Sequence, residues 1–253
     1  MPETLTFGDA TIGILVKAPV NSRQSLPFSL IALMLATVAS SQTFPSFPGG
    51  ETDRATLRTQ ERVEELYVKG SYDRAYLIYR KELAPRGDKY AQYMIGYMHF
   101  TGAGMPEDPA IALAWYRLAA ERGEPAIEVA RDQLLKTLSP AQIETADNLL
   151  VTLRSELSDR VLIFELVKQD LDKLRNGPGR GASKGSGAML VIDRRYGYMS
   201  GAQYYRLIKN RLAARLTYLK GQVDVIDVAG ADAMELAQIE LEIKELIAEI
   251  DKR

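Results

Sequence analysis

The chain has 253 residues, 46% hydrophobic and 26% charged, which is the composition of an ordinary folded protein with room for one or two domains. It has no cysteine and a single histidine, so disulfides, thiolate metal ligands and cysteine nucleophiles are excluded. The formal net charge of -1 gives the whole molecule no bulk attraction for nucleic acid or for a membrane.

Residues 1–41 are predicted to be a signal peptide with an atypical N-terminal extension. Arg23 precedes an apolar stretch over residues 26–39, and Ser40 and Ser41 follow it. This order is typical of a secretory signal, and the stretch is short for a bilayer core of about 30 Å. We therefore expect a periplasmic or secreted protein with no transmembrane span in the mature chain. An uncleaved anchor and a buried helix are the alternatives.

Residues 42–51 are rich in proline and glycine and are predicted to form a flexible tether. Residues 52–175 are predicted to form a helical repeat domain, because apolar residues recur there at steps of three and four. A break at Gly70 and Ser71 is typical of a turn between antiparallel helices. Polar residues suited to begin helices follow at three points: Asp88, Asp108 and Ser139.

A single long helix is predicted from about residue 140 to residue 175. Its apolar residues recur on a seven-residue seam: Leu150, Leu153, Leu157, Phe164, Val167, Leu171 and Leu174. A seam this narrow is typical of packing along one partner helix. Docking on the end of the repeat domain is the favoured interpretation, and self-association through this helix is the alternative.

One stretch of this domain resembles a Sel-one-like repeat, a bacterial relative of the tetratricopeptide repeat. The matching residues are Ala91, Gly96, Gly102, Gly104, Asp108, Ala112, Trp115, Tyr116, Ala119, Ala120 and Gly123. The small residues allow two helices to approach closely, and the two aromatic residues fill the groove between successive units. Residues 70–87 are similar to a degenerate neighbouring hairpin, and a third unit is expected after residue 123.

The resemblance implies an α-solenoid of about three hairpins that acts as a protein–protein scaffold, a role frequent in exported bacterial proteins. It brings no shared catalytic residues, and we predict no cofactor or metal. In such stacks the first helix of each pair lines the concave face, which points to Gln92, Tyr93 and Tyr97 as contacts for an unidentified envelope protein. The lone histidine, His99, is expected to be a partly buried packing residue; a pH switch or a ligand is the alternative.

After the helical domain, residues 176–187 are predicted to be a glycine-rich linker, and residues 188–253 a small basic α/β module. A strand over residues 188–193, a helix capped by Ser200 and a second strand over residues 222–228 are expected, followed by an acidic C-terminal helix. The predicted fold class is therefore mainly α: a short solenoid closed by a long helix, then this module.

Charge is distributed unevenly in the C-terminal third. Residues 175–220 contain ten basic residues and one acid, whereas residues 221–253 contain nine acids and three bases. Tyrosines interleave with the basic residues, which is typical of a surface for an anionic lipid, a cell-wall polymer or nucleic acid. Candidate anion-binding residues are Arg194, Arg195, Arg206, Lys209 and Arg211. The favoured interpretation is instead that the basic helix lies beside the acidic helix and neutralises it; export also argues against nucleic acid.

Two chemical functions were considered for this module, dinucleotide binding and hydrolysis. Gly177, Gly179 and Ala182 fit a dinucleotide-binding spacing, but a helix precedes them where that motif needs a strand. Ser183, Ser186 and Ser200 are candidate nucleophiles of a hydrolase, although only one histidine exists in the chain to serve them. We therefore predict that the protein is not an enzyme, with a hydrolase as the alternative.

Overall fold

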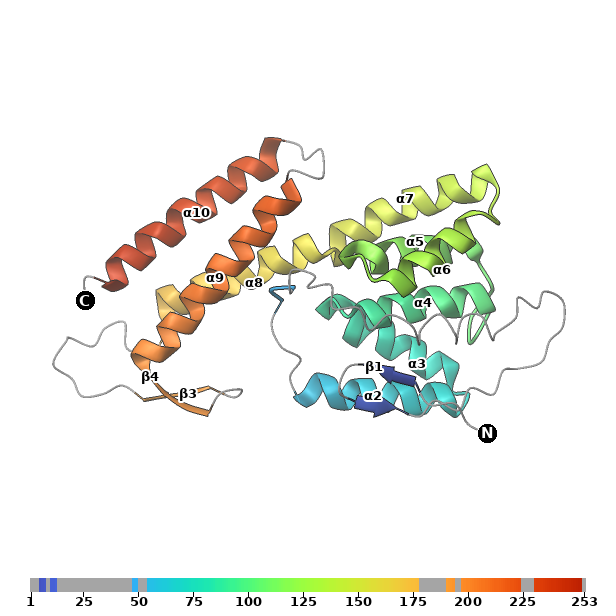
Figure 1. The fold of residues 1–253 in the computed structure, drawn as a ribbon, viewed down its shortest axis with the longest axis horizontal. Coiled ribbons are helices and arrows are strands. Elements are labelled where there is room, and N and C mark those ends of the chain that lie inside the picture. The colour runs from blue at the N-terminus through green and yellow to red at the C-terminus, as the bar shows by residue number, and fades with distance from the viewer. Residues whose placement is uncertain are drawn as a thin grey trace. The chain divides into compact units, whose positions relative to one another are not determined.

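The computed structural model places the chain in two compact units (Figure 1). It describes residues 5–7, 10–12, 47–49, 54–177, 190–193, 197–223 and 230–251. The first unit ends at Ser158, and the second begins at Asp159 and also includes the short segment Phe47–Asp53. The apolar stretch over residues 26–39, where a signal peptide is predicted, lies outside the described residues. Upstream of it, β1 (Leu5–Phe7) and β2 (Ala10–Ile12) form an antiparallel hairpin.

Consecutive helices build the first unit. They are α2 (Arg54–Val68), α3 (Tyr72–Ile78), α4 (Lys89–Thr101), α5 (Pro109–Ala119), α6 (Pro125–Leu135) and α7 (Pro140–Leu157). A π-helical turn, Tyr79–Leu83, and a 3-10 turn, Ala84–Arg86, continue α3, and a 3-10 turn, Ala120–Arg122, continues α5. The mainly α repeat architecture predicted from the sequence is confirmed.

The predicted helix starts are confirmed by their caps. The Asp88 carboxylate accepts a hydrogen bond from the Ala91 amide, and the Asp108 carboxylate accepts from two amides of α5. Ser139 and Gln142 form a reciprocal capping box at the start of α7. The end of α4 is also set by a local residue. Gly102 ends this helix with φ 68°, a left-handed conformation that glycine adopts readily.

The small residues of the repeat let α4 and α5 approach closely. A Cβ atom at Gly96 would lie 2.7 Å from the Tyr116 ring and 3.1 Å from the carbonyl oxygen of Ala112. Trp115 is buried, and the guanidinium of Arg80, from the preceding hairpin, lies 5.1 Å from its ring centroid. Buried alanines complete this contact: Ala91, Ala112, Ala119 and Ala120. Trp115 thus packs toward the preceding hairpin, as expected, whereas the Tyr116 ring packs on Gly96 within its own repeat.

The prediction of one helix over residues 140–175 is wrong. Ser158 has an extended backbone (φ -65°, ψ 155°), so α7 ends at Leu157 and a separate helix, α8 (Asp159–Asn176), begins after it. The seven-residue seam is divided accordingly. Its first three leucines are buried in the first unit, and Val167, Leu171 and Leu174 are buried in the second. Packing against other helices of the same chain accounts for these side chains without a second copy.

The second unit consists of helices and one hairpin: α8, β3 (Leu190–Asp193), β4 (Gly197–Ser200), α9 (Gly201–Val223) and α10 (Gly230–Asp251). The strands pair antiparallel, with Val191 opposite Met199 and Ile192 opposite Tyr198. The strand predicted over residues 222–228 is not formed where it can be described, because residues 222 and 223 belong to α9 and the remainder lies outside the described residues. The first strand pairs instead with residues directly after it, which was not predicted.

A buried carboxylate joins two helices of the second unit, α8 and α9. Asp170 of α8 is 1% exposed and binds the guanidinium groups of Arg211 and Arg215 from α9. Arg215 also donates to the carbonyl oxygen of Pro48, and Phe47 packs edge-on against Tyr218 at 5.6 Å. Of the tether predicted over residues 42–51, residues 47 and 48 thus contact this unit, and residues 42–46, 50 and 51 lie outside the described residues.

We predict that Gly96→Ala destabilises the first unit. The methyl group would overlap the Tyr116 ring, and overpacking of this kind costs about 1–3 kcal/mol, more than the ~1 kcal/mol that alanine gains over glycine in a helix. Urea unfolding followed by the fluorescence of Trp115, the single tryptophan, measures this unit alone.

Gly221→Ala is the matched control. Gly221 is also helical, but nothing lies within 4 Å of the position that its Cβ would take. The same substitution there is expected to raise thermal stability, measured by circular dichroism. Equal effects of the two alanines would contradict the close approach at Gly96.

Candidate functional site

Four tyrosines form a partly exposed aromatic surface on the first unit, which we call the tyrosine face: Tyr67, Tyr72, Tyr93 and Tyr97. Tyr67 comes from the last turn of α2 and Tyr72 from the start of α3, and their rings meet edge to face at 5.1 Å. Tyr93 and Tyr97 are one turn apart on α4 and stack at 6.4 Å. Residues from three helices therefore converge on one surface.

The tyrosine face rests on a buried ring. Tyr93 stacks on Tyr116 of α5, with ring centroids 5.1 Å apart and an interplanar angle of 14°. Burial is the main cause that raises the pKa of Tyr93, to about 12, and it also raises the pKa of Tyr97. At neutral pH these phenols are therefore uncharged, and the surface offers flat apolar rings with hydroxyl groups at their edges.

The partly buried carboxyl group of Glu64, on α2, lies close to tyrosines of α2 and α4. Glu64 accepts a 2.7 Å hydrogen bond from the Tyr79 hydroxyl. Burial raises the pKa of Glu64 and outweighs the hydroxyl groups of Tyr79 and Tyr90, which favour the charged form; the charge of Asp88 raises the pKa further. This is a coupled polar contact, but no histidine or metal ligand described by the structure joins it in a catalytic arrangement.

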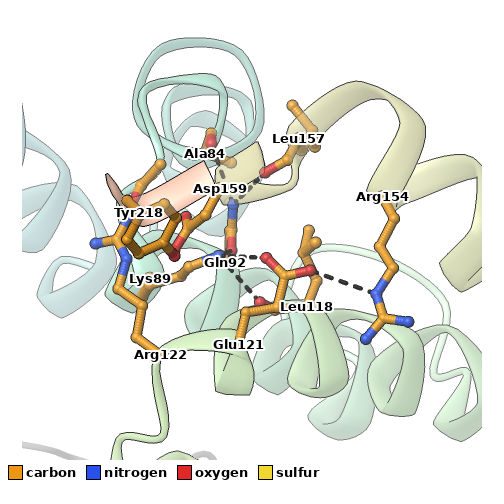
Figure 2. A network of polar contacts seen from close by, with 11 residues as sticks. Ala84, Lys89, Gln92, Leu118, Glu121, Arg122, Arg154, Leu157, Asp159 and Tyr218 are labelled. Carbon is orange, nitrogen blue, oxygen red and sulfur yellow. Dashed lines mark hydrogen bonds and ion pairs between the residues drawn. The ribbon is translucent and has the colours of Figure 1, made fainter. Parts of the chain in front are cut away.

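Gln92, predicted as a partner contact, is fully buried. Its amide nitrogen donates to the carbonyl oxygens of Ala84 (3.3 Å) and Leu157 (3.4 Å), so it ties α4 to the end of α7 (Figure 2). Gln92 was predicted as a contact because the first helix of each repeat lines the concave face, but its own side chain is buried within the unit. Tyr93 and Tyr97 are partly exposed, and they remain the contacts that we consider below.

Lys89 completes this buried network (Figure 2). Its ammonium group has an acceptor for each of its three N–H bonds: the side-chain oxygen of Gln92, the carbonyl oxygen of Leu118 and the carboxylate of Glu121, all at 3.0–3.1 Å. Glu121 also pairs with Arg154 of α7 at 3.3 Å. Each N–H bond of the Lys89 ammonium group therefore has an acceptor, and the side chain is only 8% exposed. The network joins α4, α5 and α7 and presents no reactive group.

His99 is a partly buried packing residue, as predicted. Its ring meets Tyr76 edge to face at 5.7 Å, and its Nε2 atom lies 3.4 Å from the Tyr76 hydroxyl. Burial lowers the pKa of His99, opposed by the charge of Asp108, so the imidazole is neutral at physiological pH. No cluster of metal-binding side chains occurs in the part of the chain that the structure describes.

The five predicted anion-binding residues differ in their surroundings in the structure. Arg194 and Arg195 lie outside the described residues, and Arg211 is committed to the buried Asp170, which corrects its assignment. Arg206 is exposed on α9, and Lys209 is partly exposed. Part of the expected neutralisation between basic and acidic segments is present as well, because Lys220 of α9 pairs with Glu240 of α10 at 2.9 Å.

Of the three serines considered for a hydrolase, only Ser200 lies among the described residues. Ser200 is engaged as the N-cap of α9, exchanging hydrogen bonds with Gln203, and this confirms its predicted capping role. Ser183, Ser186 and the glycine motif beyond Gly177 lie outside the described residues. Among the helices that can be described, none combines the length and apolar character needed to cross a membrane.

The raised pKa of Glu64 predicts a pH-dependent stability. The folded protein keeps this proton at pH values where the unfolded chain has lost it, so the free energy of unfolding falls as pH rises above the ordinary glutamate value of 4.5. Glu64→Gln keeps an acceptor for Tyr79 and should remove this decline. Urea unfolding between about pH 4 and pH 8 measures it. Glu65→Gln, at an exposed neighbour, should retain the wild-type profile.

Gln92→Ala is expected to lower the free energy of unfolding by about 2–3 kcal/mol, because it leaves Lys89 and two buried carbonyl groups short of partners. Gln133→Ala makes the same change at an exposed position of α6 and should stay within about 0.5 kcal/mol of wild type. The comparison is made by Trp115 fluorescence. A Gln92 variant as stable as wild type would show that the network is dispensable.

Comparison with known families identifies part of the chain that carries this site. Residues 89–124 match the family model of the Sel1 repeat. No solved structure matches the chain. The matched residues comprise α4, α5 and the turn that ends at Gly123, and Sel1 repeats are associated with scaffolding between proteins. The chain therefore contains one clear Sel1 repeat, and that repeat carries Tyr93, Tyr97 and the buried Tyr116.

Proposed function

We propose that this protein is a non-enzymatic scaffold that holds a segment of a partner protein on the tyrosine face. The observation that carries the proposal is the aromatic surface itself: four partly exposed tyrosines from three helices, gathered beside a Sel1 repeat. The four rings pack against the core of the unit, and each keeps part of its surface exposed. Tyrosine is among the residues most enriched at protein interfaces.

The geometry favours a peptide or protein as the ligand. Tyr93 is already fixed by its stack on Tyr116, so little side-chain entropy is lost when a partner binds. The uncharged hydroxyl groups suit hydrogen bonds with peptide carbonyl and amide groups, and the ring faces suit apolar side chains. The partner segment we expect is therefore uncharged and partly apolar.

We place this scaffold in the bacterial cell envelope, on the strength of the signal-like sequence over residues 23–41. Mass measurement of the chain recovered from the periplasmic fraction tests the placement. Loss of about the first 41 residues is expected. An intact chain recovered from the cytosol would refute the envelope role without bearing on the tyrosine face.

Crosslinking tests the binding surface. We expect a photoreactive phenylalanine analogue at Tyr97 to capture a specific protein from envelope extracts. The same analogue at Leu77, which is 49% exposed on α3 outside the tyrosine face, should not capture it. Mass spectrometry identifies the captured protein, and equal capture at both positions would contradict the proposed site.

With the captured protein in hand, Tyr97→Ala should weaken its binding at least about tenfold, because truncation of a central aromatic contact commonly has this effect. Tyr97→Phe removes only the hydroxyl group, so it measures how much of the binding comes from the hydroxyl group and how much from the ring. Leu77→Ala is the control and should bind as the wild type does. Tyr93 is kept intact in this series, because its stack on Tyr116 also supports the fold.

A further inference from the structure

The hairpin of the second unit exposes an apolar face. Leu190, Ile192 and Tyr198 are 64%, 70% and 73% exposed, whereas Val191 and Met199, on the opposite face, are 7% exposed. Ile192 and Tyr198 are direct cross-strand partners, so their side chains lie together. We call these three side chains the hairpin patch. Exposed apolar groups gathered in this way are typical of a surface that contacts something else.

Positive charge accompanies the hairpin patch. Tyr198 and Arg206 line the same shallow hollow of about 380 Å³ between β4 and the first turns of α9. Arg206 is exposed and forms no ion pair with another described residue, in contrast to Arg211 and Arg215, which are held by Asp170. Of the ten basic residues in residues 175–220, four are paired with acids of the same unit: Arg175, Arg211, Arg215 and Lys220. Arg206 is therefore the described cation that supplies the positive charge here.

An exposed apolar patch with an arginine beside it favours one class of partner. Two copies meeting through this surface would bring like charges together, which opposes self-association. Nucleic acid would use the positive charge and the tyrosine ring, but it has no use for exposed leucine and isoleucine side chains. An anionic lipid bilayer uses both, because its phosphate groups attract arginine and its acyl boundary accepts aliphatic side chains and tyrosine.

We infer that the hairpin patch, together with Arg206, docks the protein on the surface of an anionic phospholipid bilayer. Leu190, Ile192 and Tyr198 enter the interface between headgroups and acyl chains, and Arg206 contacts lipid phosphate. The docking is peripheral, since a two-stranded hairpin is too short to cross a bilayer. It is independent of partner binding on the tyrosine face, which belongs to the other unit.

Sedimentation of the full chain with lipid vesicles tests the inference. Binding is expected to vesicles of phosphatidylcholine with about one third phosphatidylglycerol, and it should weaken in pure phosphatidylcholine and at high salt. Ile192→Thr with Tyr198→Thr should lower the affinity at least about tenfold, since both apolar side chains are lost from the interface. Threonine is β-branched, so it keeps the strand propensity of the hairpin.

Two controls accompany this variant. Leu241→Thr removes another exposed apolar side chain of the second unit, 58% exposed on α10, and should leave vesicle binding unchanged. Arg206→Gln should weaken binding about fivefold, whereas Arg206→Lys keeps the charge and should bind as the wild type does. Circular dichroism confirms that each variant is folded.

Three results would overturn the inference. The first is that the wild-type chain does not bind the anionic vesicles, or that the threonine double variant binds them equally well. The second is a concentration-dependent dimer that the double variant abolishes, which would make a second copy the occupant. The third is tighter binding to an oligonucleotide than to vesicles, with the double variant unaffected, which would make the charge a nucleic-acid surface.

Discussion

The contact between Gly96 and Tyr116 determines much of the first unit. Because Gly96 has no side chain, the Tyr116 ring packs directly against the backbone of α4, and the two helices of the repeat close on each other. The same buried ring is the platform on which Tyr93 stacks. The packing that closes the hairpin therefore also sets the position of the aromatic surface, so a change that separates α4 from α5 alters stability and binding together.

In each unit a buried charged side chain joins its own helix to a neighbouring element. Lys89 has three acceptors in the first unit, and Asp170 in the second is bound by Arg211 and Arg215. A buried charge is tolerated only when it is matched in this way, and removal of one partner costs far more than the pair contributes. These networks fix which helices are neighbours, whereas the apolar contacts around them would tolerate several arrangements.

Local features of the fold were predictable from the sequence and non-local ones were not. The caps at Asp88, Asp108 and Ser139 depend on a few adjacent residues, so their residue types were sufficient. The break at Ser158 was missed because leucines continue on both sides of it; the Ser-Asp step, which suits a helix start, was the available signal. The side chain of Gln92 binds carbonyl groups on two other elements, one of them 65 residues away at Leu157, and sequence spacing does not predict such contacts.

The two candidate surfaces differ in the force that would hold a ligand. Neutral phenols dominate the tyrosine face, so its contacts depend on ring burial and hydrogen bonds, which salt scarcely screens. The hairpin patch combines aliphatic side chains with arginine, and the ionic part of its binding falls as ionic strength rises. Because the surfaces belong to separate compact units, a protein partner and a lipid surface would not compete for the same side chains. Salt titration therefore separates the two activities within a single chain, since only the binding that depends on Arg206 should decline.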